Sequence, residues 1–142
     1  MFKPSRFQWT LILMPALLLL TGCGSSDTVR VTGTVQRDGK PVPNLIVNFV
    51  PAEGRPSWGI TDEKGAFMLA HDKKTAGAVR GTHRVYVKYH TRDPKEDIAF
   101  HQGTLKLSPE MKAILAKYGQ METTPLRYEI TKDGQAIDVV LD

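Results

Sequence analysis

Residues 31–51 read VTGTVQRDGKPVPNLIVNFVP, and this stretch decides the fold class. Apolar and polar side chains alternate through 29–36 and again through 45–50, which is the period of two that a half-buried strand produces. Between them, Asp38-Gly39 is a typical hairpin dipeptide, because both central positions of such a turn need positive φ. The stretch therefore predicts two strands joined by a tight turn, with Leu45, Val47 and Phe49 on the inner face of the second.

Working outward, the same short pattern recurs along the rest of the chain. Further strands are predicted at 58–61, 66–69, 84–89, 126–130 and 137–141, separated by turns rich in Gly, Pro and Asp. Seven short strands of this kind are typical of an all-β fold in which two sheets pack face to face. We predict a seven-strand antiparallel β-sandwich, of the general kind seen in immunoglobulin-like domains.

One segment departs from the strand pattern. Ser108 and Pro109 suit an N-cap and a first helical residue, and apolar residues then recur at helical spacing up to Tyr118. We predict one short amphipathic helix over 109–118, inside a long crossover at 92–125. The apolar stripe of this helix either plugs an open end of the sandwich or helps a functional crossover to bind a ligand.

The single cysteine follows a hydrophobic N-terminal segment. Lys3 and Arg6 precede an apolar run at 11–20 that suits a signal peptide and is too short to cross a bilayer. The next residues, LTGC at 20–23, resemble the lipobox of bacterial lipoproteins. This resemblance implies cleavage before Cys23 and lipidation of its thiol. The alternative is an ordinary secretory signal with a chance cysteine.

These signals divide the chain into three parts. We predict a lipoprotein signal peptide at 1–22, a lipidated tether at 23–28 and a β-sandwich domain at 29–142, with the crossover as an insertion. Cleavage would remove two basic residues and no acid, which lowers the formal net charge from +4 to +2. A charge this small argues against a nucleic-acid partner, for which a clustered basic face is expected.

Candidate catalytic groups are few. Ser57 is the one serine outside the signal, the tether and the predicted helix cap, and no nucleophile-elbow motif surrounds it. The four histidines, His71, His83, His90 and His101, have no paired-ligand spacing. The sequence therefore predicts no catalytic residue, no metal site and no cofactor.

A modest basic and aromatic cluster occurs near the end of the 84–89 strand. Tyr86, Lys88, His90 and Arg92 form the candidate ligand surface, because cationic and aromatic side chains together suit a glycan or anionic headgroups. The alternative is a solvated strand edge, where lysine discourages aggregation.

Three stretches carry a family resemblance: VTGTVQRDGKPVPNLIVNFVP, GITDEKGAFML and GTHRVYVKY. They resemble the carboxypeptidase-regulatory-like, transthyretin-like domain. Together with the lipobox and the tail YGQMETTPLRYEI, they make the whole chain similar to small bacterial envelope lipoproteins. The resemblance implies a membrane-anchored, non-enzymatic structural or interaction module that meets an envelope protein or glycan.

The alternative function is a lipoprotein that binds a glycan or a metal through the 92–125 crossover. Gly24 rather than Asp follows the cysteine, and this favours the outer over the inner membrane as the location of the lipid anchor.

Overall fold

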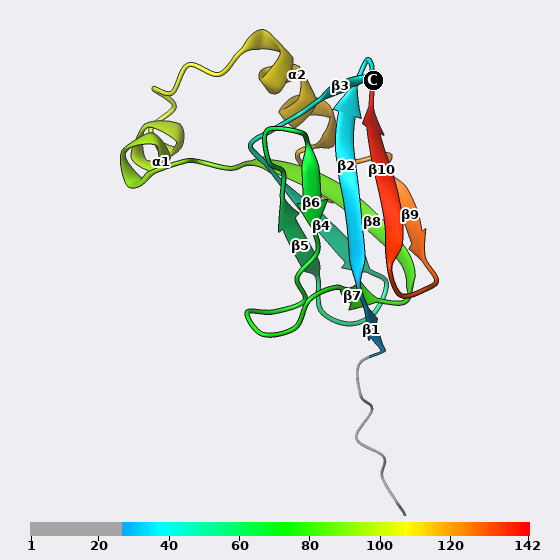
Figure 1. Ribbon diagram of the computed structural model, residues 1–142. Coiled ribbons are helices and arrows are strands. Elements are labelled where there is room, and N and C mark those ends of the chain that lie inside the picture. Colours follow the sequence, from blue (N-terminus) through cyan, green and yellow to red (C-terminus); the bar gives the residue numbers. More distant parts are fainter. Residues whose placement is uncertain (1–26) are drawn as a thin grey trace, which may run out of the picture.

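The computed structural model describes residues 27–142, which form ten strands and two short helices (Figure 1). The chain is mostly β, as the alternating pattern predicts. In chain order the elements are β1 (Thr28–Val29), β2 (Val31–Arg37), β3 (Lys40–Pro41), β4 (Leu45–Pro51), β5 (Ser57–Ile60), β6 (Ala66–Met68), β7 (Ala78–Val79), β8 (Gly81–Tyr89), α1 (Pro94–His101), α2 (Pro109–Tyr118), β9 (Arg127–Ile130) and β10 (Gln135–Leu141).

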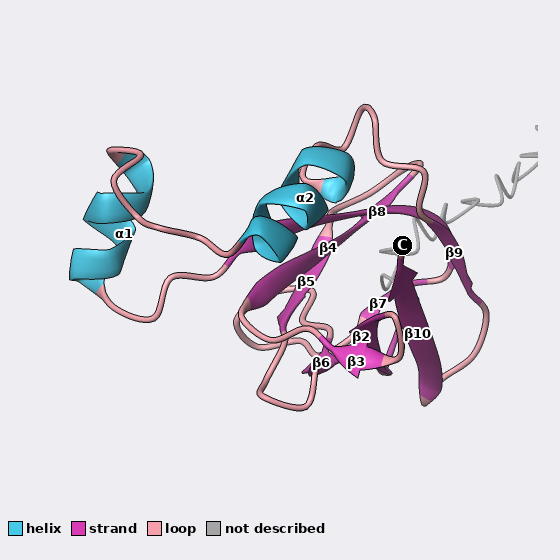
Figure 2. Ribbon diagram, turned by 90° about the horizontal axis from the view of Figure 1, so that it is seen from above, coloured by secondary structure: helices cyan, strands magenta, loops and turns pink. Residues whose placement is uncertain are grey.

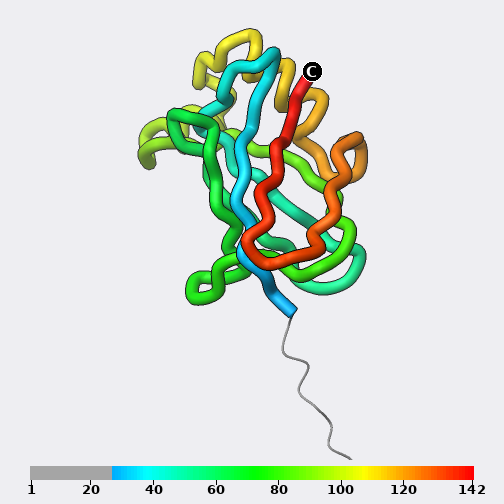
Figure 3. The backbone as a smooth tube through the Cα atoms, turned by 45° about the vertical axis from the view of Figure 1, so that its right-hand side comes forward, coloured from blue at the N-terminus to red at the C-terminus, as the bar shows by residue number. Residues whose placement is uncertain are grey.

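Two four-stranded sheets form the body of the molecule (Figures 1 and 3). The β2 sheet has the order β10-β2-β3, and β6 pairs with β2 beside β3. The β4 sheet has the order β5-β4-β8-β9. The short pair β1-β7 lies at one end of the body, while α2 and Asp142 lie at the other (Figures 1 and 3).

One strand pair corrects the expectation of a purely antiparallel arrangement. β10 runs parallel to β2, from Gln135 opposite Val31 to Leu141 opposite Arg37. The connection after β9 crosses from the β4 sheet to the β2 sheet, so β9 and β10 do not form a hairpin ladder. All seven predicted stretches contain a strand. The first is divided at Arg30 into β1 and β2, and the described residues contain two further short strands, β3 and β7.

The Asp-Gly turn forms as predicted, but it joins different strands. Asp38 and Gly39 both have positive φ, at 50° and 73°, as a type I′ hairpin requires. The turn returns the chain only into the two-residue strand β3. A further residue with positive φ, Asn44 at 58°, precedes β4, which belongs to the other sheet.

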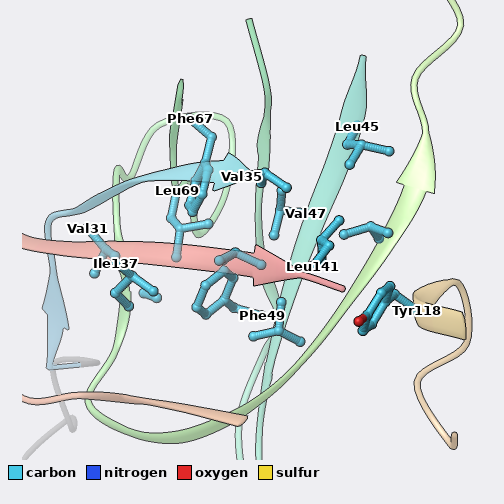
Figure 4. Close-up of a cluster of buried hydrophobic side chains, with 14 of the residues drawn as sticks. Val31, Val35, Leu45, Val47, Phe49, Phe67, Leu69, Tyr118, Ile137 and Leu141 are labelled. Atoms are coloured by element: carbon cyan, nitrogen blue, oxygen red, sulfur yellow. The ribbon is translucent and has the colours of Figure 1, made fainter. Parts of the chain in front are cut away.

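The core fills the space between the two sheets (Figure 4). Alternate residues of each long strand point inward, which accounts for the predicted burial of the inner face of β4. Helix α2 adds Ile114 and Tyr118, each 1% exposed, to the same cluster. The members of this cluster that Figure 4 labels are Val31, Val35, Leu45, Val47, Phe49, Phe67, Leu69, Tyr118, Ile137 and Leu141.

The crossover contains two helices, which corrects the prediction of one. Ser108 caps α2 as predicted, since its hydroxyl accepts a hydrogen bond from the N–H of Met111 at 3.1 Å. The unpredicted helix α1 is capped by Asp93, whose Oδ1 accepts from the N–H of Glu96 at 2.8 Å. α2 lies close to β8, whereas α1 projects away from both sheets (Figure 2).

The lipobox and most of the predicted tether lie outside the described residues. Cys23 therefore has no structural description, and lipidation at this position stays a prediction. Between Asp27 and Asp142, neither helix has the length and apolar character needed to cross a bilayer.

Candidate ligand-binding site

A crevice of about 500 Å³ opens between α1, the end of β8 and α2. We call it the β8 crevice. Residues 87–91 of β8 and the following loop form one wall, Leu115 and Gly119 of α2 form another, and Asp97, Phe100 and His101 of α1 form the third. The two helices that line it, α1 and α2, lie on the same side of the molecule (Figure 2).

The structure brings together three of the four residues of the predicted ligand surface. Lys88 and His90 line the β8 crevice. Tyr86 lies on the same outer face of β8 as Lys88, and the Lys88 ammonium is 5.6 Å from the centre of the Tyr86 ring. These two side chains also line a neighbouring hollow of about 310 Å³.

Arg92 is engaged elsewhere. Its Nη2 lies 2.9 Å from Oε1 of Glu96, and its backbone N–H donates to Oε2 at 2.6 Å. Hydrogen bonds donated by Arg92 and, to a smaller extent, by the Tyr89 hydroxyl lower the pKa of Glu96 to about 2. Arg92 therefore secures α1 against the end of β8 and does not line the β8 crevice.

Sequence reasoning missed the contribution of α1. The ring of Phe100 stacks on that of Tyr89 with centroids 5.6 Å apart, and the Tyr89 hydroxyl donates to Oε1 of Glu96 at 3.1 Å. The available signal was Asp93-Pro94 followed by Glu96, a cap of the same kind as the one recognised at Ser108. No residue of α1 is buried, so a search for an apolar stripe does not find this helix.

Ser57 contacts a histidine, although no nucleophile motif was found around it. Its hydroxyl lies 3.2 Å from Nδ1 of His71. Ser57 is fully buried at the start of β5, however, and a nucleophile must reach its substrate. The pair therefore serves the packing between β5 and the loop after β6.

The histidines do not converge. His83 is completely buried against Phe49, with ring centroids 6.0 Å apart. His90 and His101 both line the β8 crevice, and His101 lies 3.6 Å from Oδ1 of Asp97. Within residues 27–142, no three His, Cys, Asp or Glu side chains are grouped so that they could hold a metal ion.

Comparison with known proteins found no matching family model, no matching curated protein and no matching solved structure.

Proposed function

We propose that this protein is a lipid-anchored, non-enzymatic interaction module of the bacterial cell envelope, built on a transthyretin-like sandwich. The anchor is Cys23 and the favoured location is the outer membrane. The observation that carries the proposal is the order of signals at the N-terminus: a basic start, an apolar run and the LTGC motif at 20–23. The resemblance of three strand-forming stretches to the carboxypeptidase-regulatory-like domain supports the fold assignment.

The arrangement of the described residues supports an anchored module. Asp27 begins the described chain only four positions after Cys23, so the tether is short, at most about 3.5 Å per residue. The end of the body that carries β1 would therefore face the lipid. Helices α1 and α2, which line the β8 crevice, lie nearer the opposite end (Figure 1). The crevice would therefore be presented to partners away from the membrane.

The anchor is tested by Cys23→Ala in cells. We expect the variant to leave the membrane fraction, because two acyl chains give stable anchoring and the protein without them has none. Ser25→Ala is the matched control, since it changes the same segment and keeps the thiol. Membrane fractionation of Cys23→Ala equal to that of Ser25→Ala would contradict the anchor.

A second candidate function is ligand binding by the crossover, and one observation favours it. The two helices of residues 92–125, together with β8, enclose the β8 crevice. The ligand would be a glycan or another polar molecule that meets Lys88 and His90. This function is tested by titrating the full chain with acidic oligosaccharides while the chemical shifts of these two residues are measured.

A further inference from the structure

The outward face of the β4 sheet carries a row of aromatic and polar side chains. Burial alternates along β5, β4 and β8, so one face of this sheet packs against the core and the other is turned outward. We call the outward residues of β5, β4, β8 and β9 the outer β4 face. On this face, Asn48 of β4 lies opposite Trp58 of β5 on one side and opposite Tyr86 of β8 on the other.

This row leaves aromatic surface and hydrogen-bonding groups unused. Trp58 is 42% exposed, and neither its indole N–H nor the Tyr86 hydroxyl is bonded to another residue in the part of the chain that the structure describes. The Asn48 amide donates to the carbonyl of Ile46 at 3.3 Å. Because neighbouring strands are about 4.8 Å apart, the backbones that carry the two aromatic rings are about 10 Å apart. The row therefore offers two ring surfaces with a polar group between them.

Cations border the row on both sides. Lys88 is two residues beyond Tyr86 along β8, and Arg84 is two residues before it, directly opposite Arg127 of β9. Successive outward residues of a strand are about 7 Å apart, so both groups lie next to the row. Arg84 and Arg127 also line a hollow of about 430 Å³.

The two arginines have no acidic partner. Among residues 27–142, neither Arg84 nor Arg127 forms an ion pair, and the acids nearest to them in the chain, Glu122 and Glu129, form none either. Like charges directly opposite each other on a sheet repel. Other arginines do pair with an acid, and these are Arg30, Arg37, Arg80 and Arg92. The outer β4 face is thus a place where positive charge is left uncompensated.

Backbone carbonyls position both guanidinium groups. Nη1 of Arg84 donates to the carbonyl of Met121 at 3.3 Å, and Nη1 of Arg127 donates to the carbonyls of Thr124 and Leu126, both at 2.8 Å. A guanidinium has five N–H donors in a planar fork. The remaining donors suit a carboxylate, which arginine binds through two parallel hydrogen bonds. A bound anion would also relieve the repulsion between the two arginines.

We propose that the outer β4 face binds an acidic polysaccharide. The apolar faces of its sugar rings stack on Trp58 and Tyr86, its hydroxyls meet Asn48, and a carboxylate lies between Arg84 and Arg127. The uncompensated charge selects an acidic chain over a neutral one. This proposal rests on the proposed function as an interaction module and names its partner, on a surface other than the β8 crevice.

The test is a fluorescence titration of the full chain in neutral detergent micelles. Trp9→Phe leaves Trp58 as the only tryptophan. The probe is a hexamer of β-1,4-linked mannuronic acid, and β-1,4-linked mannohexaose is the control that keeps the rings and the linkage without the carboxylates. We expect the acidic hexamer to shift the Trp58 emission to shorter wavelength in a saturable manner, and the neutral hexamer to bind about tenfold more weakly.

Arg84→Gln tests the charge requirement. It should weaken binding of the acidic hexamer about fivefold to tenfold and should not lower the melting temperature, because it removes the repulsion with Arg127. Arg30→Gln is the matched control, since Arg30 lies beside β2 in the other sheet and its charge is already paired with Asp133. This control should leave the affinity unchanged.

Trp58→Ala tests the aromatic row. Isothermal titration calorimetry should show that it weakens binding about tenfold. Met68→Ala is the control, because Met68 is an exposed apolar side chain of the other sheet, and it should keep the original affinity. Circular dichroism checks that Trp58→Ala folds, and Arg84→Gln alone decides the outcome if it does not.

Four results would overturn the proposal. They are an unchanged Trp58 emission at saturating acidic hexamer, equal affinities for the acidic and neutral hexamers, a loss of affinity in His90→Ala without one in Arg84→Gln, and an emission shift produced by added phosphatidylglycerol but not by the hexamer. The third result would assign the sugar to the β8 crevice, and the fourth would assign the face to a lipid surface. The titration does not depend on the lipid at Cys23, so its failure is distinct from a failure of the Cys23→Ala test.

Discussion

The hydroxyl of Tyr118 and Asp142 form a reciprocal contact between α2 and the residue that follows β10. The hydroxyl donates to the Asp142 carboxylate and accepts from the Asp142 N–H at 3.1 Å. Lys117 Nζ lies 2.9 Å from the same carboxylate. The hydrogen bond from Tyr118 and, as the second largest cause, that from Lys117 lower the pKa of Asp142 to about 2. The contact fastens α2 to the end of the sandwich that borders the β8 crevice.

Tyr118→Phe should loosen this end of the molecule. The ring stays in the core, but the Asp142 groups lose their buried partner, so we expect the melting temperature to fall by about 4 °C. Lys117→Ala is the control, because it removes the exposed ion pair and the contact of the ammonium with the Tyr118 ring but keeps the hydroxyl. It should change the melting temperature by less than about 2 °C. If the two variants lower the melting temperature equally, the stabilisation comes from the ion pair of Lys117 with Asp142 and not from the Tyr118 hydroxyl.

Gly33 should not tolerate a side chain. It lies between Ile137 of β10 and Phe67 of β6, and an added Cβ would overlap both the Ile137 carbonyl and the Phe67 ring. We expect Gly33→Ala to lower the free energy of unfolding by about 2 kcal/mol or more. Thr32→Ala, on the exposed face of the same strand, is the matched control. Denaturant unfolding measures both, and a Gly33→Ala value no larger than the control would disprove the close approach.

Stability should fall in mild acid because of His83. Its Nδ1 lies 3.0 Å from the carbonyl of Gly81, while its Nε2 is buried with no hydrogen-bond partner among the described residues. Burial lowers the pKa of His83 in the folded state, and the contact with Gly81 only partly opposes this. The unfolded chain therefore binds the proton more readily. Stability is complete above the ordinary histidine pKa of about 6.5 and is lost as the pH falls below it.

His83→Phe tests this assignment. The ring keeps its place beside Phe49 and loses the titratable nitrogen. Between about pH 7 and about pH 5, the melting temperature of the unaltered protein should fall more than that of the variant. The exposed His101→Phe is the control and should keep the original pH dependence. Parallel pH profiles for His83→Phe and the unaltered protein would show that another group titrates.

Glu96 should hold α1 in place without supporting the rest of the fold. Its contacts with Arg92 and Tyr89 join α1 to the end of β8. We expect Glu96→Ala to speed amide exchange in α1 about fivefold, with the melting temperature unchanged. Lys95→Ala is the control, because it introduces alanine into the same helix and keeps the Glu96 contacts. Uniform acceleration across the β sheets would show that α1 is not an independent unit.

The same contact sets a pH limit for α1. Because the folded pKa of Glu96 is about 2 and its ordinary value is 4.5, the contact is intact above about pH 4.5 and is lost as the pH falls toward about 2. Exchange in α1 measured through this range should follow that loss in the unaltered protein and stay flat in Glu96→Ala.

The sequence predicts which residues are buried far better than which strands are neighbours. Alternation identifies the inner face of β4, because a period of two follows directly from strand geometry. It carries no information about partners, so the parallel pairing of β10 with β2 was not foreseen. The Asp38-Gly39 dipeptide likewise specifies a turn and not the length of the strand that follows it.

The candidate site was only half predictable for a related reason. Lys88 and His90 belong to a strand with a clear pattern and its immediate continuation, and both line the crevice. Phe100 and Leu115 reach it from a long crossover whose path depends on tertiary contacts such as the stacking of Phe100 on Tyr89.

The parallel pairing of β10 with β2 also has a consequence for biosynthesis. β2 is among the first strands to leave the ribosome, and its seven-residue partner is the last. A sheet that depends on so distant a contact forms slowly and only after β10 has been synthesised. Until then the β2 sheet lacks one of its four strands.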